Sequence, residues 1–320
     1  MIRFLLTYLI ASFVVSSVVS AQTAESYIVL ERYSRKVLLA DNSEKKRPVA
    51  GLSHMVTAKV VMDWTKAAGV SSSTLVTVPS HQFHTVAQNP LGLQPGDRLS
   101  VRDAIYSALL GEDCVATTTL ANHVGVELMQ RRQLVGNPIG VFVTEMNNLS
   151  RSLGMTRTRF ILPCGADNLT RNSFSTASDF ARLSVVLASD SGFGFYAKQK
   201  SRNLKVYKAG GGEVTLAVTN NNQLLKSGLK VVGFKSTYSP VAGQCVAELA
   251  NKDFYVEKLA SGKSKVTPVQ LVVIVLGSAR AEELTKSLIP QGWSQYDDWR
   301  NQGYMSSADR REFLKLPASL

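Results

Sequence analysis

The side chains best suited to nucleophilic or redox chemistry in this sequence are three cysteines, and they lie far apart. Cys114, Cys164 and Cys245 form no Cys-x-x-Cys pair, so the sequence has no zinc-ribbon or redox motif of that kind. In an oxidising compartment an odd count allows at most one internal disulfide and leaves one free thiol. His81 and His84 fall in a polar loop, and we interpret them as surface residues.

The first residues of the chain predict export. A positive charge at Arg3 precedes an apolar run from Phe4 to about Val19, and small residues follow at Val19-Ser20-Ala21. This is the pattern of a secretory signal peptide, residues 1–21, with cleavage after Ala21 and delivery to the periplasm or the extracellular space. The alternative, a membrane anchor, needs about 20 apolar residues, and this run is shorter and is interrupted by polar residues. We expect no integral membrane segment after signal removal.

Composition limits the class of protein. With 320 residues, of which 45% are hydrophobic and 19% charged, the chain holds enough apolar material for one large or two small domains. The formal net charge is +12, but the basic residues are scattered and form no long run. We interpret them as a solvated basic surface and expect no nucleic-acid partner. We also expect no cofactor and no metal, and the sequence does not specify an oligomeric state.

The hydrophobic pattern changes twice along the chain. Residues 27–40 are rich in strand formers around a turn and predict a hairpin. A central stretch has helical spacing, and Ser100 with Asp103 is a capping-box variant that opens one of its helices. The expected helices are 51–68, closed by Gly69, then the one opened by Ser100, then 116–129, 141–153, 176–187 and 279–288. The expected strands after residue 213 are 214–218, 230–234, 244–249 and 270–276.

This order predicts an α+β fold. Strands at both ends of the chain would form one antiparallel sheet, and the central helices would pack on and beside it. The stretch 267–277 is the most apolar after the N-terminus, and its length favours a buried strand over a membrane span.

Several segments, taken in order, resemble one known family. They include "SYIVLERYSRKVLLADNSEKKRPVAG", "LSVRDAIYSALL", "LGMTRTRFILPCG", "FSTASDFARLSVVL" and "VVGFKSTYSPVAGQCVAELA". Together they are similar to the serine D-alanyl-D-alanine carboxypeptidases, the low-molecular-mass penicillin-binding proteins. The resemblance implies a β-lactamase/transpeptidase-like domain over residues 22–293, and it leaves residues 294–320 as an unassigned extension.

That family works through three motifs. A Ser-x-x-Lys supplies the nucleophile and a lysine that takes its proton, and a Ser-x-Asn loop adds a hydroxyl and an amide. A Lys-Thr-Gly strand holds the substrate, and backbone N–H groups of the nucleophile and of the residue after Lys-Thr-Gly form the oxyanion hole. In this sequence the three positions hold Gly51-Leu52-Ser53-His54, Glu112-Asp113-Cys114 and Lys235-Ser236-Thr237.

The resemblance implies specific consequences for these substitutions. Gly51 cannot form an acyl-enzyme. We expect Glu112 to pair with Lys235 and to compete with a substrate carboxylate. Thr237 is expected to fill the space that a side chain at Gly51 would need. Lys235, Ser236, Thr237 and Tyr238 are the substrate-binding candidates.

A shift of register does not restore the first motif. Ser53 is close by, but the residue three positions further is Val56. The nearest downstream lysine, Lys59, is six positions away and lies on another face of the helix.

The resemblance also implies that His54, Glu112, Cys114 and Lys235 share one cleft, and it leaves several alternatives open. The cleft is an inactive polar cluster, or it holds a new Cys-His nucleophile with Glu112 orienting His54, or it holds a metal ion between His54, Glu112 and Cys114. A disulfide between Cys114 and Cys164 would abolish the last two, and two unpaired buried cysteines are the alternative to it.

Two functions follow from these alternatives. The first is a non-catalytic, exported member of the family that binds a peptidoglycan stem peptide or another cell-wall component. The second is an active but divergent hydrolase, either a serine-type D-Ala-D-Ala carboxypeptidase or a Cys-His enzyme that uses Cys114 and His54.

Overall fold

The computed structural model describes residues 26–80, 88–167, 171–307, 309 and 311–317. The expected signal peptide and the two loop histidines, His81 and His84, therefore lie outside the described residues.

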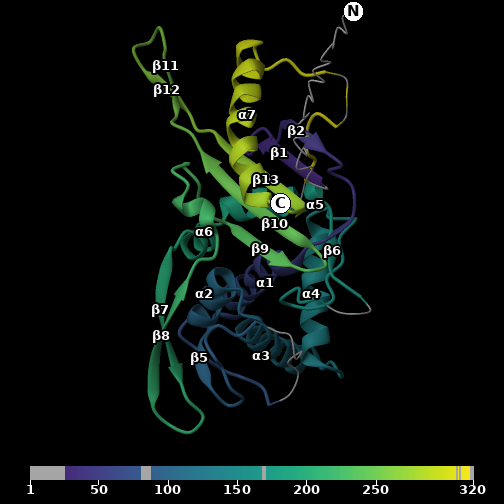
Figure 1. The fold of residues 1–320 in the computed structure, drawn as a ribbon, viewed down its shortest axis with the longest axis vertical. Helices are drawn as coiled ribbons and strands as arrows, with labels where there is room; N and C mark the ends of the chain where they lie inside the picture. Colours follow the sequence, from purple (N-terminus) through teal and green to yellow (C-terminus); the bar gives the residue numbers. More distant parts are fainter. Residues whose placement is uncertain (1–25, 81–87, 168–170, 308, 310, 318–320) are drawn as a thin grey trace, which may run out of the picture.

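The centre of the molecule is a five-stranded antiparallel sheet that joins the two ends of the chain (Figure 1). Its order is β2-β1-β13-β10-β9. The predicted N-terminal hairpin and the predicted strands 244–249 and 270–276 are confirmed in this sheet, whereas the predicted strand 214–218 lies in a separate four-stranded sheet. The bounds are β1 Ser26–Glu31, β2 Val37–Asp41, β9 Lys235–Ser239, β10 Gly243–Asn251 and β13 Gln270–Ser278.

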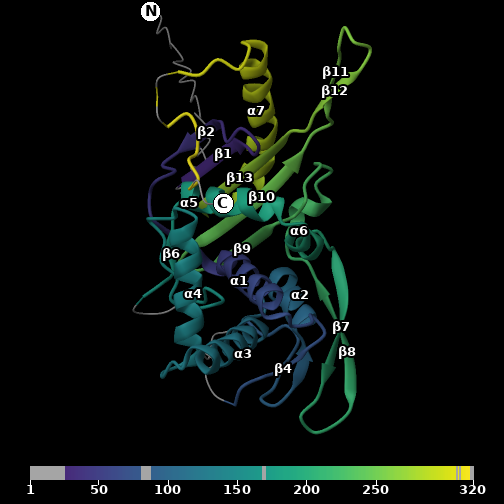
Figure 2. The same ribbon diagram turned by 180° about the vertical axis from the view of Figure 1, so that it is seen from behind.

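Each face of this sheet is covered by helices. Because side chains alternate along a strand, Ile28 and Leu30 of β1 join the larger core on one face, while Val29 joins a second core on the other. The larger core includes α5 (Ala177–Ser189), and the second includes α7 (Ala281–Asn301). Figures 1 and 2 show the two helices in front of the sheet in opposite views. The predicted α+β architecture, an antiparallel sheet packed with helices, is confirmed.

A helical block adjoins the face that α5 covers. Its helices are α1 Ser53–Ala68, α2 Val101–Gly111, α3 Cys114–Arg132, α4 Pro138–Ser152 and α6 Ser191–Ala197. The expected caps are confirmed, since the Ser100 hydroxyl accepts a hydrogen bond from the Asp103 N–H and Gly69 ends α1 in the left-handed conformation. No helix in the described part of the chain is long and apolar enough to cross a membrane.

Smaller elements complete the fold. A four-stranded sheet, β4-β5-β7-β8, flanks the helical block, and the β11–β12 hairpin projects from the molecule near α7 (Figures 1 and 2). The bounds are β3 Arg47–Pro48, η1 Ala50–Leu52, β4 Leu75–Thr77, β5 Arg98–Ser100, β6 Phe174–Ser175, β7 Ser201–Tyr207, β8 Glu213–Thr219, η2 Gln223–Lys226, β11 Tyr255–Lys258 and β12 Ser264–Thr267.

The expected strand over 230–234 is wrong. Within it only Val231 forms a bridge to the sheet, and β9 begins at Lys235. The N–H groups of Gly233 and Phe234 donate to the Glu248 carboxylate instead of to a neighbouring strand, and Gly233 has a positive φ of 89°.

The last helix is longer than the sequence predicts. It continues through Pro290 to Asn301, so residue 293, where the domain was expected to end, lies inside α7. Gly292 is a packing residue there, because a Cβ would lie 2.8 Å from Val29 Cγ1 and 2.9 Å from a Leu271 methyl group. Its lack of a side chain allows the helix to approach the sheet closely.

Candidate active site

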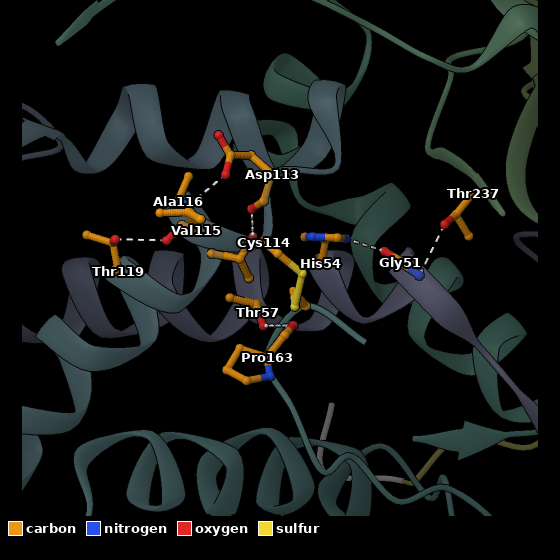
Figure 3. The surroundings of a disulfide bond; sticks show 12 residues. Gly51, His54, Thr57, Asp113, Cys114, Val115, Ala116, Thr119, Pro163 and Thr237 are labelled. Carbon is orange, nitrogen blue, oxygen red and sulfur yellow. Dashed lines mark hydrogen bonds between the residues drawn. A yellow bond between two sulfur atoms is a disulfide. The ribbon is translucent and has the colours of Figure 1, made fainter. Parts of the chain in front are cut away.

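Gly51, which the sequence resemblance assigns to the nucleophile position, lies in the η1 turn immediately before α1. Its N–H donates to the Thr237 Oγ1 at 3.1 Å (Figure 3). A Cβ at Gly51 would lie 2.6 Å from the Thr237 Oγ1 and 2.8 Å from the Glu112 Oε1. The expectation that Thr237 fills this space is confirmed. The Thr237 hydroxyl also accepts the hydrogen bond of the Gly51 N–H, the group that an oxyanion hole would use.

His54, which the sequence resemblance assigns to the lysine position, follows in the first turn of α1. Its Nδ1 is 2.7 Å from the Gly51 carbonyl oxygen. Since a carbonyl only accepts, Nδ1 carries the proton of the neutral ring, which leaves Nε2 as an acceptor. Burial, and next the nearby charge of Lys235, lower the pKa of His54 from 6.5 to about 4. The ring is therefore neutral at pH 7, and Nε2 has no hydrogen-bond partner among the described residues.

Glu112 and Lys235, which the sequence resemblance assigns to the second and third motifs, face each other. Glu112 ends α2 in the left-handed conformation, and the Lys235 Nζ lies 3.5 Å from its Oε1. This places the two as an ion pair, as expected, but beyond normal hydrogen-bond length. The Lys235 ammonium donates to the Leu109 carbonyl at 2.9 Å. Burial lowers the pKa of Lys235, and the Glu112 carboxylate opposes this change.

Cys114 begins α3 and is joined to Cys164 by a disulfide (Figure 3). This corrects two alternatives from the sequence. A Cys114 nucleophile activated by His54 is wrong, and so is a metal site that uses the Cys114 thiolate, because the sulfur is already bonded. The free thiol is Cys245, which is buried in β10, and burial raises its pKa to about 12.

The cleft itself is small, with a volume of about 290 Å³. It is lined by Gly51, His54, Glu112, the disulfide, Asp167, Thr237 and Tyr238, among others. Of the four substrate-binding candidates, Thr237 and Tyr238 border the cleft. Ser236 and Lys235 are buried and are not among its lining residues. The structure thus brings His54, Glu112 and Thr237 together and sets Ser236 apart.

Two acidic residues position this site and were missed in the sequence. Asp167 accepts from the Ser239 hydroxyl at 2.8 Å and from the Val241 N–H, which fixes the end of β9. Glu248, fully buried, accepts from Asn222 at 2.9 Å as well as from the turn before Lys235. The sequence contained a sign of this role, because a carboxylate inside an otherwise apolar strand needs several hydrogen-bond donors around it. Asp167 gave no comparable signal.

Known proteins with similar sequences belong to one family. The family model for D-alanyl-D-alanine carboxypeptidase matches residues 14–257. The chain is 29% identical to DacC of Escherichia coli over 69% of its own length and 51% of that protein. It is 22% identical to DacF of Bacillus subtilis over 72% of its own length and 55% of that protein. It therefore spans about half the length of these curated relatives.

Solved structures agree on the fold. The DD-transpeptidase of Streptomyces strain K15 superposes with a TM-score of 0.70 at 22% identity and covers 85% of this chain and 97% of that one. Penicillin-binding protein D2 of Listeria monocytogenes, bound to ampicillin, gives a TM-score of 0.65 at 22% identity, with coverage of 84% and 97%. On the match to the family model, this chain belongs to the D-alanyl-D-alanine carboxypeptidase family.

Proposed function

We propose that this chain is a non-catalytic member of its family, exported to bind a peptidoglycan stem peptide or another cell-wall component. The observation that carries the proposal is the packing around Gly51. The nucleophile position has no side chain, and the space for one is taken by the Thr237 hydroxyl and the Glu112 carboxylate. The Gly51 N–H, which would otherwise stabilise an oxyanion, already donates to Thr237.

The electrostatics of the cleft support the same proposal. A substrate carboxylate would need a free cation, but the Lys235 ammonium is buried, donates to the Leu109 carbonyl and faces Glu112. The histidine at the lysine position makes its one N–H donation to the Gly51 carbonyl. Proton transfer from a hydroxyl would therefore have to use the remaining lone pair of a neutral ring with a pKa of about 4, which is a weak base at pH 7.

The alternative is a divergent serine-type carboxypeptidase, for which Ser53 is the nearest serine to the motif. Ser53 is fully buried, and it does not border the cleft. A nucleophile must reach the substrate carbonyl, so this position favours a packing role for Ser53.

A fluorescent penicillin tests the proposal. We expect no adduct that survives denaturation and no release of D-alanine from a D-Ala-D-Ala peptide, because no acyl-enzyme forms. DacC of Escherichia coli, assayed in parallel, is the positive control. A stable fluorescent band for this chain, abolished by Ser53→Ala, would contradict the proposal in favour of the serine enzyme.

Export is the second part of the proposal and has its own test. It is supported by the N-terminal sequence pattern and by membership of a family that acts on the cell wall. N-terminal sequencing of the mature protein from a cell fraction should begin at Gln22. A mature chain that retains residues 1–21 would contradict signal cleavage.

A further inference from the structure

We propose that the cleft beside Gly51 binds a primary ammonium group of its ligand, with Glu112 accepting the charge, in place of the carboxylate that the family's third motif holds. This inference rests on the proposed function, since it names the chemistry by which a non-catalytic cleft would recognise a cell-wall peptide.

The first support is a pair of buried acceptors whose hydrogen-bonding capacity is not filled. In the described part of the protein, the His54 Nε2 has no hydrogen-bond partner, and the Glu112 Oε1 has no donor closer than the Lys235 ammonium, which lies 3.5 Å away. Glu112 is 7% exposed and His54 1%, and both border the cleft. Since His54 Nδ1 is committed to the Gly51 carbonyl, its Nε2 offers a lone pair and no proton. Two acceptors left in this way call for a ligand that donates, and an ammonium group has three donors and no acceptor.

The second support is that two donors that a carboxylate would use, the Gly51 N–H and the Lys235 ammonium, already have acceptors. The Gly51 N–H donates to the Thr237 hydroxyl, and the Lys235 ammonium donates to the Leu109 carbonyl behind the cleft. Binding a carboxylate here would break one of these bonds and would place the new charge next to Glu112.

The third support is the charge of the lining. The chain as a whole carries a formal charge of +12, yet the described residues that border the cleft include two carboxylates, Glu112 and Asp167, and neither Lys nor Arg. Lys235 lies beneath the cleft and balances one of the two negative charges. A cation is therefore the favoured ligand charge.

Size and shape restrict what enters. A volume of about 290 Å³ is near the lower end for ligand sites, so it holds the end of a peptide side chain and not a whole stem peptide. Tyr238, 62% exposed at the rim, offers an aromatic face beside an entering ammonium group. We therefore assign the free side-chain amine of a lysine-type residue in a cell-wall peptide as the group that binds.

Two matched peptides test the assignment with the intact protein. The first is Nα-acetyl-Lys-D-Ala-D-Ala amide, which has a free amine and no carboxylate. The second is Nα,Nε-diacetyl-Lys-D-Ala-D-Ala, which has a free carboxylate and no amine. Calorimetric titration at low salt should give at least about tenfold tighter binding of the first peptide, the size expected for one charge-assisted hydrogen bond.

A variant locates the contact. Glu112→Gln keeps the shape of the side chain and removes its charge, and it should weaken binding of the amine peptide about tenfold. Glu257→Gln, on the exposed β11 strand away from the cleft, is the matched control and should leave the affinity unchanged. If the Glu112 variant does not fold, the comparison of the two peptides on the unaltered protein decides alone.

The outcomes separate this inference from the proposed function. Equal or tighter binding of the diacetylated peptide, or no binding of either peptide, overturns the ammonium assignment. If penicillin also fails to label the protein, the non-catalytic proposal still stands. Covalent penicillin labelling would contradict the proposed function whichever peptide binds more tightly.

Discussion

At the scale of single residues, the site is held by contacts that depend on one another. The Thr237 hydroxyl fits because Gly51 has no side chain, and the Glu112 carboxylate occupies the rest of the same space. The backbone of Gly51 itself has no positive φ, so the restriction on larger residues comes from packing and not from the main chain.

Gly51→Ser should therefore destabilise the protein and restore no acylation. The new Cβ would meet the Thr237 Oγ1 at 2.6 Å, and overpacking of this kind costs about 1–3 kcal/mol. Urea denaturation measures the free energy of unfolding, and a penicillin label measures acylation. Thr237→Ala removes the clashing hydroxyl, so the double variant should lose less stability than the two single variants together, by about 0.5 kcal/mol or more.

A matched cycle provides the control for that coupling. Ser236 is adjacent in β9, but its side chain points to the other side of the strand, because successive strand residues alternate. Gly51→Ser combined with Ser236→Ala should give additive effects. Equal coupling in both cycles would show that the strand as a whole, and not the Thr237 hydroxyl, restricts Gly51.

His54 makes stability depend on pH in the acidic range. Its pKa is about 4 in the folded protein and ordinarily 6.5, so between these values the unfolded chain binds a proton that the folded chain does not. Stability from the neutral ring is complete above about pH 6.5 and is lost as pH falls toward 4, by about 3 kcal/mol in total. The test is to measure the free energy of unfolding of the parent and of His54→Gln from pH 7.5 to 4.5. The variant should lose distinctly less stability over this range than the parent. If the stability of both proteins falls in parallel with pH, titratable groups other than His54 determine the pH dependence between pH 7.5 and 4.5.

At the scale of elements, the disulfide connects the start of α3 to the loop that faces α1. Cys114 and Cys164 are 50 residues apart, and the Pro163 carbonyl beside the bond accepts from the Thr57 hydroxyl of α1 at 2.8 Å. One covalent link thus holds together two segments that border the cleft. Constraining a loop of this length stabilises a protein by about 2–4 kcal/mol.

Reduction of this bond has a predicted result. Dithiothreitol should lower the thermal midpoint of the parent protein and should leave that of a Cys164→Ala variant unchanged. Mass spectrometry after alkylation should label Cys245 once the protein is unfolded, and Cys114 and Cys164 only when reductant is added as well. Labelling of all three thiols without reductant would disprove the bridge.

The sequence predicted those elements whose signals are local. Ser100 and Asp103 mark a cap, and the hairpin at residues 27–40 has two strand-forming runs around a turn, so both were correct. The last helix was expected to end at residue 288, but α7 continues through Pro290 to Asn301, and Gly292 packs closely against the sheet. The positions of the altered motifs came from family resemblance. The Cys114–Cys164 pairing was left open, because spacing along the chain does not fix distance in space.

At the scale of the whole molecule, the C-terminal segment returns to the start of β2, the edge strand of the central sheet. Residues 312–314 pair antiparallel with residues 35–37 and form a bridge between Phe313 and Lys36. The Val37 N–H donates to the Glu312 carbonyl at 2.8 Å, and the Leu314 N–H donates to the Arg35 carbonyl at 2.9 Å. An ion pair between Lys36 and Glu312 adds a charged contact. This segment therefore covers the backbone groups where the edge strand begins.

Weakening this segment should both destabilise the protein and promote self-association. Leu314 is 6% exposed, and Leu314→Ala should cost about 2 kcal/mol or more in the free energy of unfolding, because it removes a buried side chain. Met305→Ala is the matched control, since Met305 is 71% exposed and should change stability by less than about 0.5 kcal/mol. Deletion of residues 304–320 uncovers the start of the β2 edge, and light scattering should then detect dimers or larger species that the parent does not form at the same concentration. If the deleted protein stays monomeric and keeps the parent's stability, the segment is not what protects the edge, and the sheet must be guarded by its own short and twisted β2 strand.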